Sequence, residues 1–159
     1  MKRLLPALML GAAAALAGCS QPEGSYAAFS ALPGSRWPYP DTLLIEPSLP
    51  DSVAVGRLAV AVRHTNGYEY RNLWLEISTP MLDTLVTDTV NIGLADDYGR
   101  WYGRGIGVSY VTTDTLPGSY CLTRGSAVRV RHIMRVDTLR DIEQIGLIFI
   151  PETCTPPTR

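Results

Sequence analysis

Lysine is nearly missing from this sequence: Lys2 is the only one, and every other basic residue is Arg. The 14 basic residues include Lys2 and Arg3, so residues 19–159 keep 12 basic against 15 acidic residues, a net charge of about −3. A nucleic-acid-binding domain needs a concentrated basic surface. This charge balance therefore predicts no nucleic-acid partner.

Histidine and the motifs of catalysis are equally sparse. The two histidines, His64 and His132, are far apart in the sequence, whereas a zinc site needs three or four ligands with supporting hydrogen bonds. We expect both to be ordinary surface or partly buried residues. No Gly-x-Ser-x-Gly motif occurs and no Cys–His signature surrounds Cys121. The sequence predicts no catalytic residue, metal, cofactor or small-molecule substrate, and hence no enzyme.

Long helical patterns are also missing, apart from one candidate turn at residues 138–144. Apolar residues instead alternate with polar ones in short runs, as strands with one buried face do. Turn-forming residues separate these runs at intervals typical of an antiparallel sandwich. The alternating runs cover residues 58–63, 72–78 and 128–131, and residues 146–150 form a short, nearly continuous apolar run. The predicted fold is all-β, an antiparallel, jelly-roll-like β-sandwich.

The N-terminus has the layout of an export signal. Lys2 and Arg3 precede an apolar run over residues 4–17, which is too short to span a bilayer comfortably, since a spanning helix needs about 20 apolar residues. The tetrapeptide Leu16-Ala17-Gly18-Cys19 resembles the lipobox of bacterial lipoproteins. That resemblance implies cleavage between Gly18 and Cys19 and acylation of Cys19 by palmitate-type fatty acids, which anchor a protein durably.

These signals divide the chain into four parts: a signal peptide at 1–18, a lipidated tether at 19–40, the sandwich at 41–151 and a disordered tail at 152–159. Gly, Ser, Pro and Ala dominate the tether, as in flexible linkers. Ser20, rather than Asp, follows the lipidated residue. Enterobacterial lipoproteins retained in the inner membrane carry Asp at this position, so the resemblance to lipoproteins implies the outer membrane. Glu23 is the only nearby acid, a poor match to the acidic surface-export tag of some lipoproteins, which favours the periplasmic leaflet.

Two cysteines remain after lipidation of Cys19, namely Cys121 and Cys154. The oxidising periplasm permits a disulfide between them, but two unpaired thiols are an equally open interpretation.

Residues 94–107 are the most unusual stretch, with several closely spaced glycines among aromatic and Arg residues. No Gly-Lys-Ser/Thr follows, so the stretch is not a phosphate-binding loop. Adjacent Asp96 and Asp97 fit a turn stabilised by their own side chains. Exposed aromatic and Arg side chains suit a binding face, for which the candidates are Trp74, Trp101, Tyr102 and Arg104. The alternative is a bulged strand or corner whose aromatic residues pack on the core.

Several segments in the same order along the chain resemble the GldH-type gliding-motility lipoproteins. They are the lipobox, residues 32–34 with Trp37, and residues 63–75, 88–90, 94–96, 99–107, 118–120, 134–135 and 139–147. The resemblance implies a non-enzymatic lipoprotein of the gliding apparatus, linked to type IX protein secretion, whose partners are other envelope proteins of that machinery. It assigns no catalytic residue and lends no support to a Cys121–Cys154 bond.

Two other functions stay open on the residues alone. A carbohydrate-binding module would use Trp74 and Trp101 in one shallow groove. A periplasmic hydrolase would need a nucleophile beside Asp96, His64 or His132, and the sequence offers no such grouping.

Overall fold

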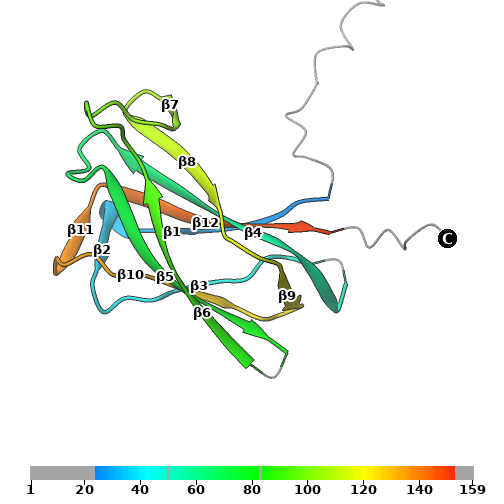
Figure 1. Cartoon of the computed structure of the whole chain (residues 1–159). Helices are drawn as coiled ribbons and strands as arrows, with labels where there is room; N and C mark the ends of the chain where they lie inside the picture. The colour runs from blue at the N-terminus through cyan, green and yellow to red at the C-terminus, as the bar shows by residue number, and fades with distance from the viewer. Residues whose placement is uncertain (1–23, 50, 83, 153–159) are drawn as a thin grey trace, which may run out of the picture.

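The computed structural model describes residues 24–49, 51–82 and 84–152, almost all of them in strands or in the turns between them (Figure 1). The one helical segment in these ranges is the short 3-10 turn Pro33–Ser35, so none of their helices has the length to cross a membrane. The strands are β1 (Tyr26–Ala31), β2 (Arg36–Pro38), β3 (Leu43–Ile45), β4 (Val53–Thr65), β5 (Asn72–Met81), β6 (Thr84–Gly93), β7 (Arg104–Ile106), β8 (Ser109–Thr115), β9 (Tyr120–Thr123), β10 (Val128–His132), β11 (Thr138–Arg140) and β12 (Ile142–Pro151).

The strands form two main antiparallel sheets that face each other. The first sheet has the order β1-β12-β4-β8-β7, with β9 also paired to β4, and the second has the order β3-β10-β5-β6. A small third sheet joins β11 to β2. The predicted antiparallel β-sandwich is confirmed.

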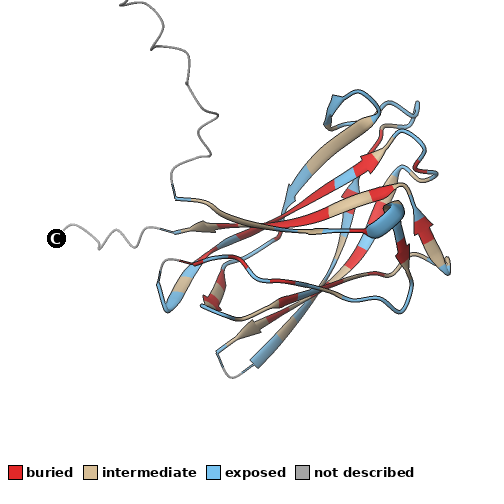
Figure 2. Ribbon diagram, turned by 180° about the vertical axis from the view of Figure 1, so that it is seen from behind, coloured by how far each residue is buried: buried red, intermediate tan, exposed pale blue. Residues whose placement is uncertain are grey.

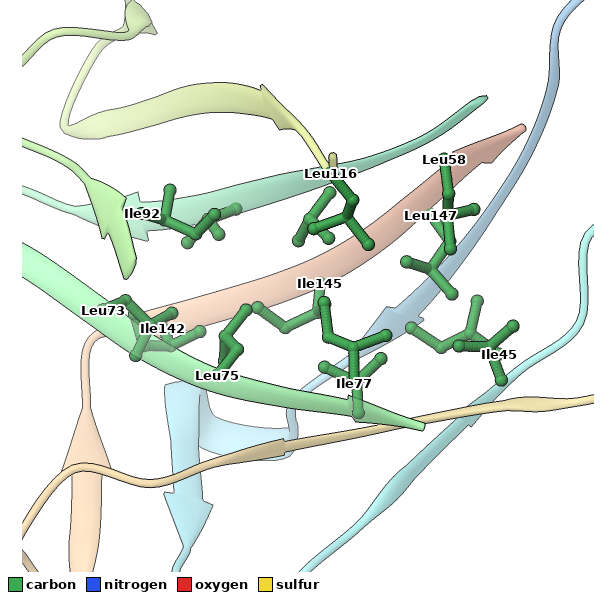
Figure 3. Packing of buried hydrophobic residues seen from close by; sticks show 14 of the residues in the cluster. Ile45, Leu58, Leu73, Leu75, Ile77, Ile92, Leu116, Ile142, Ile145 and Leu147 are labelled. Carbon is green, nitrogen blue, oxygen red and sulfur yellow. The ribbon is translucent and has the colours of Figure 1, made fainter. Parts of the chain in front are cut away.

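The core between the sheets follows from the alternation in the sequence. Along β4, Leu58, Val60 and Val62 are fully buried, whereas Arg57 and Arg63 on the opposite face are exposed. Figure 2 shows the same alternation of buried and exposed residues along other strands. Figure 3 shows how the layers meet, with Leu73, Leu75 and Ile77 of β5 facing Ile142, Ile145 and Leu147 of β12.

Two sequence-based expectations are wrong. The candidate helical turn at residues 138–144 is instead β11 followed by the start of β12, with Asp141 at the corner between them. The folded domain also begins well before residue 41, because β1 pairs with β12 from Tyr26 to Ala31. The predicted tether at 19–40 is therefore too long, and its Ala- and Ser-rich composition concealed an edge strand.

Trp37 also lies in the segment predicted to be tether, and it is fully buried in the core. Its indole N–H donates to the backbone carbonyl of Asp41 at 3.0 Å. Residues 36–38 are therefore part of the folded domain. At the other end of the domain, β12 ends at Pro151.

Candidate functional site at the distal end of the sandwich

The sandwich has two ends with different character. Tyr26 pairs with Phe149, which pairs with Leu58, whereas Ile106 pairs with Ser109, which pairs with Thr65. Seven residues of β4 separate the two levels, a distance of about 23 Å. Residues 66–71 and 94–108, together with the corner at Asp141, form what we call the distal end. In Figure 1 the β7 hairpin marks this end, and β1 begins and β12 ends on the opposite side.

An aromatic cluster closes the distal end around His64, the last inward-facing residue of β4. The His64 ring centroid lies 4.5 Å from Trp101, 5.8 Å from Tyr68 and 5.9 Å from Tyr110. Tyr68 contacts Tyr70 in turn, at 5.5 Å. The cluster joins β4, β8 and the turn before β5 to the irregular segment that carries Trp101.

His64 is held neutral within this cluster. Its side chain is fully buried, contrary to our expectation of an exposed or half-buried residue, because it continues the inward alternation of Leu58, Val60 and Val62. Nδ1–H donates to the carbonyl of Thr65 at 2.9 Å, and Nε2 is buried with no hydrogen-bond partner. Burial lowers the pKa of His64, and the opposing effects of the Thr65 carbonyl and the Glu143 charge are smaller.

Polar bonds fix the turn after β4 to the corner between β11 and β12. The Thr65 hydroxyl donates to Asp141 Oδ1 at 2.6 Å, and the Thr65 amide donates to the Asp141 carbonyl at 2.9 Å. Asp141 has a φ of 66°, a left-handed conformation that Asp tolerates better than most residues. The Asp141 carboxylate also packs closely on Gly67, where a Cβ would lie 2.9 Å from its Oδ1. The turn is thus a defined structure rather than a loose loop.

The turn at residues 96–100 is organised by Asp96. Its Oδ1 accepts from the backbone N–H groups of Tyr98 and Arg100, each at 2.9 Å, and its Oδ2 accepts from Arg100 Nε at 2.8 Å. These bonds, the Arg100 amide first, lower the pKa of Asp96. The neighbouring Asp97 pairs with Arg71 across the distal end. The predicted turn stabilised by Asp side chains is confirmed, and it presents Tyr98 with 87% of its surface exposed.

Large apolar side chains are exposed around this frame. Ile106, at the end of β7, is 93% exposed, and Val108 follows on the other side of Gly107. Tyr102 and Tyr98 are exposed on the adjoining segment. Clustered exposed apolar residues mark interaction surfaces more often than scattered ones do. The distal end therefore offers a contact surface on a rigid support.

The four predicted binding-face residues do not share one surface. Trp101 is half-buried against His64, as in the alternative interpretation of a corner whose aromatic residues pack on the core. Tyr102 is exposed, with its ring 3.7 Å from where a Cβ of Gly93 would lie, and Arg104 is exposed on β7 opposite Val111 of the first sheet. Trp74 is exposed on the outer face of β5, one row from Gly93, which the Tyr102 ring contacts. A groove built from Trp74 and Trp101 is therefore not formed.

The other predicted positions are dispersed. His132 is fully buried beneath Trp37 and Tyr39, with its Nε2 3.1 Å from the Trp37 carbonyl. Cys121 is half-buried on β9, and Cys154 lies outside the described residues, as do Gly18 and Cys19. Lipidation, cleavage and the disulfide stay predictions. Within residues 24–49, 51–82 and 84–152, no group of three His, Cys, Asp or Glu side chains is placed to hold a metal ion.

These features define a class of protein: a two-sheet antiparallel sandwich whose loops build an aromatic-closed contact surface at one end. Residues 24–148 match the sequence model described as GldH lipoprotein, and the chain belongs to this family. It is thus a gliding-motility-associated lipoprotein of the cell envelope. No curated protein and no solved structure matches the chain. Four of the segments that carried the family resemblance, residues 63–75, 94–96, 99–107 and 139–147, meet at or beside the distal end.

The two buried histidines predict a pH-dependent stability. Burial is the main cause that lowers the pKa of both His64 and His132 below their ordinary value of 6.5. Above pH 6.5 the folded and unfolded chains are both neutral at these sites, and the full stability is present. As the pH falls below 6.5, the two histidines become protonated in the unfolded chain but stay neutral in the folded one. The free energy of unfolding then drops by up to about 1.4 kcal/mol per pH unit for each histidine, until the folded pKa is reached.

Urea unfolding at pH values from 7.5 to 5 measures this slope. The variants His64→Gln and His132→Gln should each flatten it, whatever their effect on stability at pH 7.5, because each removes one titrating group. Arg57→Gln, an exposed substitution on the outer face of β4, serves as the matched control. An unchanged slope in the double His variant would show that other groups govern the pH dependence.

Proposed function

We propose that this protein is a non-enzymatic accessory component of the gliding motility and type IX secretion apparatus, anchored by acyl chains on Cys19 to the periplasmic leaflet of the outer membrane. The family match supports the association with gliding, and the lipobox supports the anchor. Ser20 after the lipidated residue supports the choice of membrane. The distal end is the surface that contacts a protein of the apparatus.

The proposal rests on one observation: the strand that follows the lipidated residue and the exposed side chains of the distal end lie at opposite ends of the sandwich. Only the six residues 20–25 separate Cys19 from β1, so this linker reaches at most about 25 Å. The chain enters the sandwich at the end far from Ile106, Val108 and Tyr98 (Figure 1). A lipid at one end thus leaves the contact surface directed toward the other side, where an envelope partner can reach it.

Replacing Cys19 by alanine tests the anchor. We expect the variant to leave the outer-membrane fraction almost completely, because each buried methylene of an acyl chain contributes about 0.8 kcal/mol to membrane binding and the apolar run at residues 4–17 is too short to span a bilayer comfortably. Fractionation followed by immunoblotting measures the distribution, and Ser20→Ala is the matched control. Retention of Cys19→Ala in the outer-membrane fraction after a salt wash would contradict the acyl anchor.

The contact surface needs a separate test in living cells. We expect Ile106→Asp combined with Val108→Asp to reduce colony spreading in a gliding host, or type IX cargo secretion in another, while the protein stays folded and anchored. Leu85→Asp is the matched control, since Leu85 is an exposed apolar residue of β6 outside the distal end. Equal effects of the two changes, or no effect of the first, would contradict the role of the distal end.

A further inference from the structure

On the outer face of the second sheet, side chains of neighbouring strands stand side by side in rows across the sheet. The proposed function does not use this face. On β5, Trp74, Glu76 and Ser78 point outward from every second position. Trp74 stands opposite Asn91 of β6, and Glu76 stands between Thr89 of β6 and Arg131 of β10. In the next row, Ser78 stands between Thr87 and Arg129. Successive rows are about 6.7 Å apart, because each is two residues further along the strand.

A hollow of about 230 Å³ lies across two of these rows. Its lining is Thr42, Glu76, Ser78, Arg129 and Arg131. All five side chains end in polar or charged groups, so the hollow suits a polar ligand rather than an apolar one. Trp74 lies one row away, on the same face of β5.

The hollow carries more positive than negative charge. Arg131 donates from Nε and Nη2 to the two carboxylate oxygens of Glu76, at 2.7 and 3.0 Å. This paired geometry compensates both groups. Arg129 takes part in no ion pair among the described residues. The hollow therefore retains one uncompensated positive charge, which complements an anionic group.

Trp74 gives this face an aromatic platform. Its side chain is 41% exposed, and the sheet outside it is polar rather than apolar. Beside it, Asn72 Nδ2–H donates to Asn91 Oδ1 at 2.7 Å, which fixes two amide side chains next to the indole. The hydroxyl groups of Ser78 and Thr87 lie 3.0 Å apart one row beyond Glu76. Protein interfaces have an apolar core, whereas a single exposed indole amid amides, hydroxyls and guanidinium groups matches a sugar ring and its hydroxyls.

We propose that the outer face of the β3-β10-β5-β6 sheet binds an acidic saccharide, with one sugar ring stacked on Trp74 and the anionic group in the hollow at Arg129. The separation of two rows, about 13 Å, requires an oligosaccharide rather than a single sugar. The charge that Arg129 recognises is a carboxylate or a phosphate on that saccharide. This site lies on the outer face of the second sheet and adjoins the distal end, because the row of Gly93, which Tyr102 contacts, is next to the row of Trp74.

The test uses the lipidated full-length protein in neutral phosphatidylcholine nanodiscs. The probes are trigalacturonate, the neutral trisaccharide galactotriose, a phosphorylated galactotriose and inorganic phosphate, each titrated by calorimetry. We expect an acidic trisaccharide to bind about tenfold more tightly than the neutral one, because one charged hydrogen bond is gained. The better of the two acidic probes identifies the carboxylate or the phosphate as the ligand group.

Two substitutions divide the site. Arg129→Gln should reduce binding of the acidic trisaccharide to that of the neutral one, and Trp74→Ala should abolish binding of both. Two control variants make comparable changes on the outer face of the first sheet: Phe29→Ala removes an aromatic ring and Arg57→Gln removes a positive charge. Both should leave binding unchanged. Trp74→Tyr keeps a stacking ring and should retain binding, which separates loss of the platform from loss of the fold.

Several results would overturn the proposal. One is equal affinity for the acidic and neutral trisaccharides, and another is no binding of any saccharide at millimolar concentration. A third is a Trp74→Ala variant that binds like the wild type. Binding of inorganic phosphate as tight as that of the acidic saccharides would show an anion site without saccharide recognition.

Discussion

Replacing Trp37 by alanine is expected to lower the free energy of unfolding by about 3–5 kcal/mol, the range seen when large buried aromatic residues are truncated. Trp37 is fully buried, and its ring centroid lies 5.2 Å from that of His132 in an edge-to-face contact. The substitution removes this packing together with the hydrogen bond to Asp41. Urea unfolding followed by circular dichroism measures the change.

Two comparisons make this result specific. Trp37→Phe keeps an aromatic ring but loses the indole N–H, and should cost less than Trp37→Ala. Trp74→Ala removes the same side chain from an exposed position and should cost about 1 kcal/mol or less. A loss below about 1 kcal/mol for Trp37→Ala would mean that residues 36–38 are not part of the core.

The outcome at Trp37 bears on how well the sequence defines this fold. Period-two alternation identified β4, β5 and β10, because a strand with one face on the core must alternate. It did not identify β1, where Ala and Ser occupy positions 27, 28, 30 and 31 and no apolar contrast exists. At Asp141 the left-handed corner interrupts the strand pattern, and the local sequence imitates a helical turn. Such features depend on partners distant in the chain, which composition does not reveal.

The same limit applies to the candidate site. The turn formed by Asp96 was predictable, because its hydrogen bonds are made within four residues. The role of His64 was not, because its neighbours Trp101 and Tyr110 come from segments about 40 residues away. One signal was present: His64 lies at the same parity as Leu58, Val60 and Val62, which places it on the buried face of β4. Parity therefore predicts burial, whereas the identity of the packing partners requires the tertiary structure.

Adding a single methyl group at Gly56 is the second change with a large expected effect. Gly56 of β4 pairs with Tyr120 on one side and with Pro151 on the other. A Cβ there would lie 2.3 Å from the carbonyl oxygen of Ile150 and 2.8 Å from Cα of Pro151. These are backbone atoms that no rotamer change can move aside. We expect Gly56→Ala to cost about 3 kcal/mol, the upper part of the range for overpacking, measured by urea unfolding.

Gly146→Ala provides the matched control. Its Cβ would also lie 2.3 Å from a neighbour, but that neighbour is the half-exposed ring of Phe29, which can swing into solvent. The loss should be smaller, and it should nearly vanish in a Phe29→Ala background, as a double-mutant cycle would show. Equal losses for Gly56→Ala and Gly146→Ala would contradict the distinction between backbone and side-chain obstruction.

The free edge of β6 has a consequence for how this protein behaves when many copies share one membrane surface. Among the described strands, the ten-residue β6 pairs on one side only, with β5, and a free strand edge of this kind invites a second copy to add to the sheet. Asp88 points inward from that edge, where its carboxylate accepts a hydrogen bond from the Tyr120 hydroxyl at 2.9 Å. An added strand would cover this carboxylate and remove it from water. The free-energy cost of this desolvation opposes the addition of a second copy. Many copies can thus share one bilayer without aggregating through β6, because the Asp88 carboxylate opposes strand addition.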